Sequence, residues 1–325
     1  MNHPQDARAA RARRRRRAVM RRRMIAVGVI AGIGIVIVIG ATTRLGHGGD
    51  RASATQASSA PELPRGGTRI FPRYRVVAFY GAPQDAALGT LGIGTPTEAA
   101  ARLAEQASDY DSLRRPVLPA FELLASIATF SPGPDGTYRT RQADDVIRRY
   151  LESARQAGAL LILDVQPGRS PFMDEVRRLR PFLEEPDVGL ALDPEWSMGT
   201  GQVPGKVFGS TDAATVNAVS AYLAAIVRER NLPQKLLIVH QFLQGMIRQK
   251  NRLVKRRELA LVVNVDGFGT PANKVSKYDL LSTGRPRFRN GFKLFYDEDR
   301  RGQSRLMTPA EVLALSPSPD VIVYE

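Results

Sequence analysis

Two acidic residues, Asp193 and Glu195, lie two positions apart in the segment Leu192-Asp193-Pro194-Glu195-Trp196. In an extended strand, this spacing places both carboxylates on one face, about 6.6 Å apart along the backbone. Such a pair suits the cleavage of glycosidic bonds, because one carboxyl can keep its proton while the other carries charge. An Asp at a strand end can also simply cap a turn, but a charged pair beside a buried strand must be solvated or hydrogen-bonded. We therefore predict that Asp193 and Glu195 are catalytic.

Short apolar runs alternate with amphipathic stretches from Tyr74 onward. The expected strands are 75–80, 117–122, 160–165, 188–193, 235–240, 259–265, 292–296 and 321–324. The expected helices are 96–113, 141–157, 171–183, 212–230, 243–253, 271–281 and 309–315. This alternation predicts an α/β fold, a (β/α)8 TIM-type barrel that ends at strand eight without the usual eighth helix. A doubly wound open sheet is the alternative, and Pro119 makes the second strand the least secure.

Four helices are predicted to begin in the same way. Thr95, Ser170, Thr270 and Thr308 each precede a proline. A hydroxyl side chain at the N-cap followed by Pro at the first helical position is typical of a helix start.

Polar or aromatic residues follow nearly every predicted strand. In a barrel, the active site lies at the C-terminal ends of the strands, so these residues are expected to surround one cleft. We predict that they bind a polyhydroxylated ligand, although a strand-end Asp can be a cap, a lone His structural and a Trp part of the core. The candidate substrate-binding residues are Tyr80, Asp164, Gln166, Trp196, His240, Asn264, Asp266 and Tyr296.

No metal and no cofactor are predicted. His240 is the one histidine of the expected barrel, and a single histidine cannot form a histidine-based zinc site. Residues 201–206 are too short for a phosphate-binding loop, and neither G-x-G-x-x-G after the first strand nor G-x-S-x-G is present. The chain has no cysteine, which excludes disulfides and thiolate chemistry.

The N-terminal segment predicts a membrane anchor. Residues 1–23 carry ten arginines and one Asp, so they supply +9 of the net charge of +15 and leave +6 for the rest. Residues 24–41 form an uninterrupted apolar run whose helix would be about 27 Å long, enough to cross a lipid bilayer. Arginines before such a helix hold the N-terminus in the cytoplasm, so the barrel is expected outside it. A cleaved signal peptide is the alternative, and a nucleic-acid partner is not expected.

Four regions follow from these patterns. Residues 1–23 are an Arg-rich cytoplasmic tail, and 24–41 are the transmembrane helix. Residues 42–72 are rich in Gly, Ser, Ala and Pro and are predicted to be a disordered linker. Residues 73–325 form the barrel domain.

The segment from Gly189 to Glu195 resembles the fourth-strand signature of family 18 glycoside hydrolases, the chitinase-like barrels, which reads D-G-x-D-x-D-x-E. This resemblance implies that Glu195 is the general acid and that Asp193 orients the N-acetyl group of the substrate. Val188 and Ala191 stand where the family has its two earlier acidic residues. A D-x-E at the end of a barrel strand is also found in the family 25 muramidases, which cut peptidoglycan.

These observations predict a membrane-anchored, extracytoplasmic glycoside hydrolase that acts on a cell-envelope or environmental polysaccharide. Val188 and Ala191 also leave open a second interpretation. In that case the barrel is catalytically inactive and serves as a cell-surface glycan-binding or scaffold protein.

Overall fold

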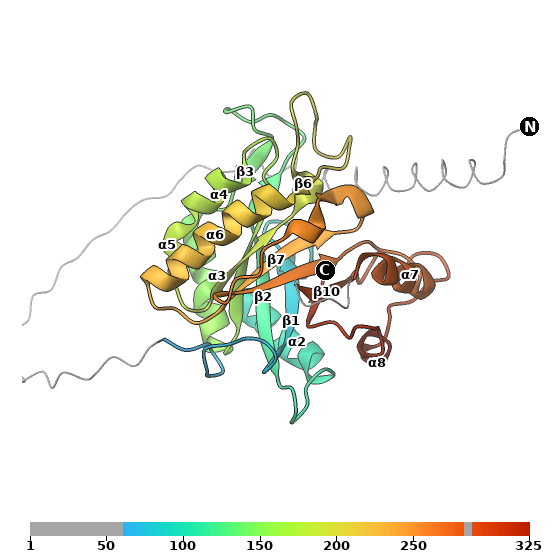
Figure 1. Cartoon of the computed structure of the whole chain (residues 1–325). Coiled ribbons are helices and arrows are strands. Elements are labelled where there is room, and N and C mark those ends of the chain that lie inside the picture. Colours follow the sequence, from blue (N-terminus) through green and yellow to red (C-terminus); the bar gives the residue numbers. More distant parts are fainter. Residues whose placement is uncertain (1–60, 283–287) are drawn as a thin grey trace, which may run out of the picture.

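The computed structural model describes residues 61–282 and 288–325, and in them eight parallel strands form a closed ring (Figure 1). Strand β1 pairs with both β2 and β11, which closes the ring. The TIM-type barrel is therefore confirmed, and the open doubly wound sheet is wrong. The barrel strands are β1 (Arg75–Gly81), β2 (Val117–Ala128), β4 (Leu160–Val165), β5 (Val188–Leu192), β7 (Lys235–Gln241), β9 (Leu259–Val265), β10 (Arg289–Leu294) and β11 (Val321–Tyr324).

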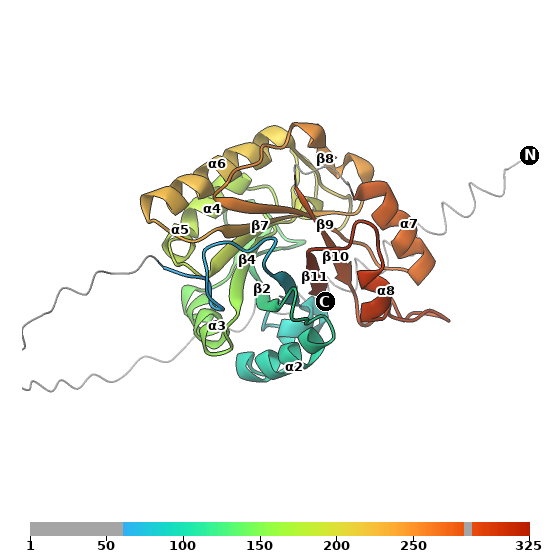
Figure 2. The ribbon, with the colours of Figure 1, turned by 60° about the horizontal axis from the view of Figure 1, so that its bottom comes forward.

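The helices surround the outside of the strands (Figure 2). They are α2 (Pro96–Ser108), α3 (Asp144–Gln156), α4 (Phe172–Arg178), α5 (Arg180–Leu183), α6 (Ala213–Glu229), α7 (Pro271–Leu281) and α8 (Pro309–Leu313). The predicted helix over residues 243–253 is wrong. Two short 3-10 turns, η5 (Gln244–Met246) and η6 (Lys250–Arg252), flank a strand there, β8 (Ile247–Arg248), whose backbone pairs with β6 (Thr211–Asp212).

Three of the four predicted helix starts are confirmed. The side chains of Thr95 and Thr308 form capping boxes with Glu98 and Glu311, and Thr270 accepts the N–H of Asn273. Ser170 is the exception, because Pro171 is itself the N-cap of α4. The Ser170 hydroxyl instead donates to the buried carboxylate of Glu175 at 2.7 Å.

Strand β2 is twice as long as predicted, which moves Glu122 from a strand end to the middle of a strand. Pro119 is accommodated in the strand, and the chain continues extended to Ala128. The added length pairs with a short antiparallel strand, β3 (Arg139–Arg141). Alternation along the strand points Glu122 into the barrel, and the added length of β2 places it among other side chains rather than at the rim.

The lower half of the barrel interior, at the N-terminal ends of the strands, is apolar. Its inward residues alternate with outward residues that pack on the helices, as the two-residue period of a strand requires. The inward set includes Val76, Ala78, Leu118, Ala120, Leu160, Ile162, Leu236, Ile238, Val262, Val321 and Val323.

Residues 61–74 close the lower end of the barrel. Leu63, Ile70 and Phe71 are buried against the inward apolar set, and the Gln234 N–H donates to the Thr68 carbonyl at 2.8 Å. The predicted linker over residues 42–72 is therefore corrected for 61–72, which belong to the folded domain. A composition rich in Gly and Pro does not prevent burial where a few apolar side chains fill the open end of a barrel.

The predicted tail and membrane span lie outside the described residues. None of the helices in the described part of the chain has the length and hydropathy that membrane crossing requires.

Candidate functional site

Every strand of the barrel contributes an inward polar side chain above its apolar part, either within the strand, as Glu122 does in β2, or directly after it, as Asp193 does after β5. These side chains lie directly above the apolar lower half. They point inward because residues alternate between the two faces of each strand. They are Tyr80, Glu122, Asp164, Asp193, His240, Asn264 with Asp266, Lys293 and Glu325. We call this set the polar layer.

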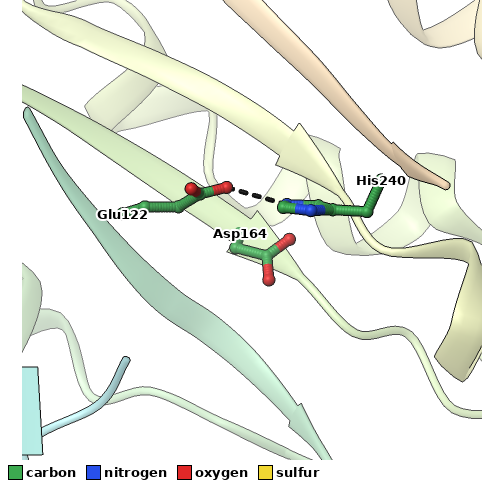
Figure 3. A group of neighbouring side chains, drawn as sticks. All are labelled: Glu122, Asp164 and His240. Carbon is green, nitrogen blue, oxygen red and sulfur yellow. Dashed lines mark hydrogen bonds and ion pairs between the residues drawn. The ribbon is translucent and has the colours of Figure 1, made fainter. Parts of the chain in front are cut away.

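His240 lies between two carboxylates in the centre of the polar layer. Its Nε2 is 2.8 Å from Glu122 Oε1, and its Nδ1 is 2.8 Å from Asp266 Oδ2. Figure 3 shows the first contact, with Asp164 beside it. Asn264 Nδ2 donates to Asp266 Oδ1 at 2.6 Å, which fixes the second carboxylate. Burial by itself lowers the pKa of His240, but the charges of Asp266 and Glu122 raise it well above its ordinary value.

A second chain of hydrogen bonds holds Asp164. The Tyr80 hydroxyl donates to Asp164 Oδ2 at 3.0 Å, and it accepts from Gln166 Nε2 at 3.1 Å. Gln166 is fixed in turn, because its Oε1 accepts the Ala128 N–H at 3.1 Å. Burial, and then the neighbouring carboxylate of Asp164, raise the pKa of Tyr80 well above its ordinary value, so its hydroxyl stays a donor.

Two carboxyls of the polar layer have raised pKa values. Burial raises the pKa of Asp164 to about 6, against the opposing effect of His240. Burial and then the charge of Asp164 raise the pKa of Asp193 to about 8. At neutral pH, Asp193 therefore holds a proton and can donate a hydrogen bond.

Lys293 is the one lysine in the polar layer. Its Nζ lies 2.8 Å from Glu325 Oε2 and 3.4 Å from the centre of the Tyr80 ring. Burial lowers its pKa, but the charge of Glu325 and other carboxylates outweighs burial and raises it. The ammonium therefore stays charged beside the phenol ring.

A pocket opens at the barrel mouth above this layer. Its polar and aromatic lining includes Tyr80, Gln166, Asp193, Glu195, Trp196 and Lys293. The volume of the cavity is about 60 Å³, which is room for roughly four to six water molecules. The pocket brings the predicted catalytic pair together with a tryptophan, at the end of the barrel where the fold predicts an active site.

The geometry of the catalytic pair differs from the prediction. Strand β5 ends at Leu192, and Asp193 is the N-cap of a 3-10 turn, η4 (Pro194–Trp196). Asp193 Oδ1 accepts the Glu195 N–H at 3.3 Å, so the two residues are not on one face of an extended strand. Proline after Asp193 favours this turn, because it fixes φ near the value of a first helical residue.

Glu195 is held by the loop that follows it. Its carbonyl accepts the Gly209 N–H at 2.7 Å. A Cβ on Gly209 would lie 2.3 Å from the Ser197 carbonyl oxygen, so only glycine permits this close approach. The Trp196 ring packs with Ala128, and Phe130 and Phe208 pack against both, so only 8% of Trp196 is exposed.

The structure separates the predicted residues into three groups. Tyr80, Gln166, Asp193, Glu195 and Trp196 line the mouth pocket. Asp164, His240, Asn264 and Asp266 belong to the polar layer but not to that lining.

Tyr296 is in neither group. It lines a second pocket, of about 180 Å³, which shares Ala87 and Glu325 with the mouth pocket. Strand β10 ends at Leu294, two residues earlier than predicted. Tyr296 therefore lies outside the barrel, where its ring stacks on Tyr324 and its hydroxyl donates to Gln106 of α2 at 2.6 Å.

Three members of the polar layer, Glu122, Lys293 and Glu325, are absent from the predicted site. Glu122 lies in mid-strand, and the predicted eighth strand pointed to Tyr324, whose side chain faces outward. Their signal was the two-residue alternation. Every second residue from Val76 points inward, which includes Tyr80. Glu122 of β2 pairs with Tyr80, and Lys293 of β10 pairs with the inward Val323 of β11, so both also point inward.

Among the residues that the structure describes, one group of side chains could hold a metal ion. Glu122, Asp164 and His240 each offer one ligand atom, and the three atoms lie within 4.8 Å of one another. A single histidine excludes a histidine-based zinc site, but it does not exclude a site of one imidazole with two carboxylates.

Comparison with known proteins gives little beyond the barrel. No family model matches the chain, and no curated protein matches it. A spore coat polysaccharide biosynthesis protein from Bacillus subtilis matches with a TM-score of 0.42 and 10% identity, over 77% of this chain and 59% of that one. This chain thus spans less than two thirds of that protein. A D-allulose 3-epimerase from Methylomonas sp. matches with a TM-score of 0.37 and 11% identity, over 78% of this chain and 84% of that one. Neither likeness is close enough to carry an argument about function.

Proposed function

We propose that this protein is a glycoside hydrolase that binds a saccharide in the mouth pocket and cleaves it with Glu195 and Asp193. The observation that carries the proposal is the lining of one pocket by both acids and by Trp196, at the C-terminal mouth of a barrel. Hydrogen-bonding side chains of Tyr80 and Gln166 complete a lining suited to sugar hydroxyls.

The two acids take different roles in this proposal. Glu195 is half-buried, whereas only 5% of Asp193 is exposed. Glu195 is therefore the group that can reach a glycosidic oxygen and protonate it as the general acid. Asp193, fixed beside it by the Glu195 N–H and protonated at neutral pH, orients a substrate group through a hydrogen bond. These are the roles that the family 18 resemblance implies.

The proposed substrate is a polysaccharide of the cell envelope or the surroundings. This part of the proposal rests on the sequence, because residues 24–41 predict a membrane anchor that places the barrel outside the cytoplasm. Protease digestion of intact cells tests it. Loss of the barrel to external protease supports the proposed location, and protection until the membrane is opened contradicts it.

The small size of the pocket favours a second candidate function, the binding of a glycan without cleavage. With room for roughly four to six water molecules, the cavity holds at most one sugar ring. In this alternative, only a substituent such as an acetamido or hydroxymethyl group enters the pocket, and no glycosidic bond reaches Glu195.

Activity measurements separate the two candidates. The purified full-length chain is assayed on polysaccharides and aryl glycosides together with Glu195→Gln. Removal of a general acid is expected to lower the rate by about 10²–10⁴-fold on substrates whose leaving group needs protonation. Glu152→Gln, an exposed acid on α3, is the matched control and is expected to retain full activity. Glycan binding without turnover in any of the three proteins would favour the second candidate.

A further inference from the structure

We propose that Glu122, Asp164 and His240 bind a divalent transition-metal ion inside the barrel, next to the mouth pocket. The three residues come from β2, β4 and β7, and their ligand atoms lie within 4.8 Å of one another. All three side chains are buried, with 0%, 0% and 1% exposed.

Unpartnered oxygens provide the first independent support. Glu122 Oε2, Asp164 Oδ1 and Asn264 Oδ1 are fully buried, and none of them has a hydrogen-bond partner among the described residues. A buried carboxylate oxygen without a partner is strongly unfavourable. Two of these atoms belong to the proposed ligands, so an ion bound by Asp164 Oδ1 and by both carboxylate oxygens of Glu122 would remove that cost.

Another buried carboxylate shows what a satisfied acid looks like in this protein. Glu175 accepts from Arg139, from Arg141 and from the Ser170 hydroxyl, at 2.7–3.0 Å. Such a carboxylate needs no ion. Within residues 61–282 and 288–325, no arginine contacts the three proposed ligands.

Outer partners orient two of the proposed ligands. Asp266 accepts from His240 Nδ1, and Asn264 holds Asp266, so Nε2 of the ring points toward Glu122. A carboxylate on the far nitrogen of a histidine is the common arrangement behind metal-binding histidines. Asp164 Oδ2 accepts a hydrogen bond from the Tyr80 hydroxyl, so Oδ1 is the oxygen that would bind the ion. The ion would take the place of the proton between Nε2 and Glu122 Oε1.

The distance between two ligand atoms is compatible with octahedral coordination. His240 Nε2 and Glu122 Oε1 are 2.8 Å apart. With metal–ligand bonds of about 2.1 Å, that separation subtends about 85° at the ion, close to the right angle between neighbouring ligands of an octahedron. A tetrahedral ion would require about 3.4 Å between them. One imidazole with two carboxylates suits Mn²⁺, Fe²⁺ or Co²⁺ better than Mg²⁺ or Ca²⁺, which prefer oxygen ligands alone.

The charge of the polar layer also favours a cation. It contains five carboxyls, of which Asp193 is protonated, against two cations, the Lys293 ammonium and the His240 imidazolium. A divalent ion would reduce this surplus of negative charge and place a Lewis acid beside the pocket that Tyr80 and Asp193 line.

Cobalt binding by the full-length chain tests the proposal. The protein is treated with EDTA, dialysed and titrated with CoCl₂ in a calorimeter. We expect one Co²⁺ per chain, a rise of several degrees in the melting temperature, and the weak visible absorption of six-coordinate cobalt. Asp164→Asn should weaken binding by at least 100-fold. Asp266→Asn, which changes the group that orients His240 and removes one nearby charge but no ligand, should weaken it by about 10–100-fold.

Two controls keep the test decisive. EDTA-treated Asp164→Asn should melt no lower than the wild type, so that lost binding cannot be blamed on misfolding. Glu152→Gln, with its exposed side chain, should bind cobalt as the wild type does. Failure of the wild type to bind one equivalent, or equal binding by Asp164→Asn, would overturn the proposal and leave water as the partner of the buried oxygens. Because binding is measured without turnover, this result does not depend on whether the protein hydrolyses a glycan.

Discussion

The two halves of the barrel interior follow opposite rules, although the same strands build both. The lower half is filled by aliphatic side chains such as Ile162 and Ile238, and residues 61–74 close it. The upper half carries five carboxyls, one lysine and one histidine, and three of its buried oxygens have no partner within the described residues. The lower half stabilises the fold by excluding water, whereas the upper half tolerates buried charge that only a ligand, an ion or a proton can balance. Evidence for function therefore lies in the half that is less favourable for stability.

The largest expected effect is the loss of unfolding free energy caused by a substitution in the lower half. Ile238→Ala removes a side chain with no exposure from the apolar layer, and it should lower the free energy of unfolding by about 3 kcal/mol. Urea denaturation measures the loss. Cobalt binding by the folded variant should stay within a factor of two, and a large change there would show that the halves are coupled.

The second largest effect is the pH dependence of the unfolding free energy that a buried lysine of the lower half produces. Lys235 lies at the lower end of β7, where its ammonium donates to the Glu185 and Val188 carbonyls, and burial lowers its pKa to about 7. Between this value and the pKa of the unfolded chain, the unfolded state binds more protons, so the free energy of unfolding rises with pH. Lys235 should raise the free energy of unfolding by about 2 kcal/mol between pH 7 and pH 9.

Lys235→Met is the control for that measurement. Its unfolding free energy, taken by urea denaturation at both pH values, should lack the part of the rise that Lys235 supplies. An identical rise in both proteins would assign the effect to other groups.

Removing a charge from the upper half should not lower the free energy of unfolding, in contrast to removing an apolar side chain from the lower half. Asp164→Asn removes a buried charge while its side-chain carbonyl can still accept from the Tyr80 hydroxyl. In EDTA at pH 7, it should leave the free energy of unfolding unchanged or raise it by about 1 kcal/mol. Calorimetric melting measures this, and a loss of several kcal/mol would mean that the carboxylate is a structural part of the barrel.

The smallest effect is expected outside the barrel. Tyr296→Phe removes the hydrogen bond to Gln106, which should cost about 1 kcal/mol or less. Hydrolysis and glycan binding should not change, because Tyr296 is absent from the mouth pocket. A selective loss of glycan affinity, seen by calorimetry, would return Tyr296 to the site.

Local sequence signals placed the barrel strands with few errors. Strands β4, β9 and β11 match their predicted bounds, because each is a short apolar run between polar segments. The prediction failed where tertiary contacts override the local pattern. Residues 243–253 have a helical pattern, yet pairing of β8 with β6 holds them extended in part. Residues 61–72 read as a linker, yet they are buried against the barrel.

The candidate site was predictable in part. Residues directly after strands, such as Gln166, Glu195 and Trp196, were found because a barrel places all strand ends at one mouth. Glu122 and Lys293 were not, because their inward direction depends on where each strand begins and on the register of its neighbours. Tyr296 was assigned to the mouth because its strand was placed two residues too late.

The sequence by itself determined the alternation of strands and helices, the helix caps at Thr95, Thr270 and Thr308, and the acids near the end of the fifth strand. Short-range steric and hydrogen-bonding preferences suffice for these features. Only the tertiary structure decided that the sheet closes and that Glu122, Asp164 and His240 converge from three separate strands. Closure and register are long-range properties, because they fix which inward side chains share one level of the barrel.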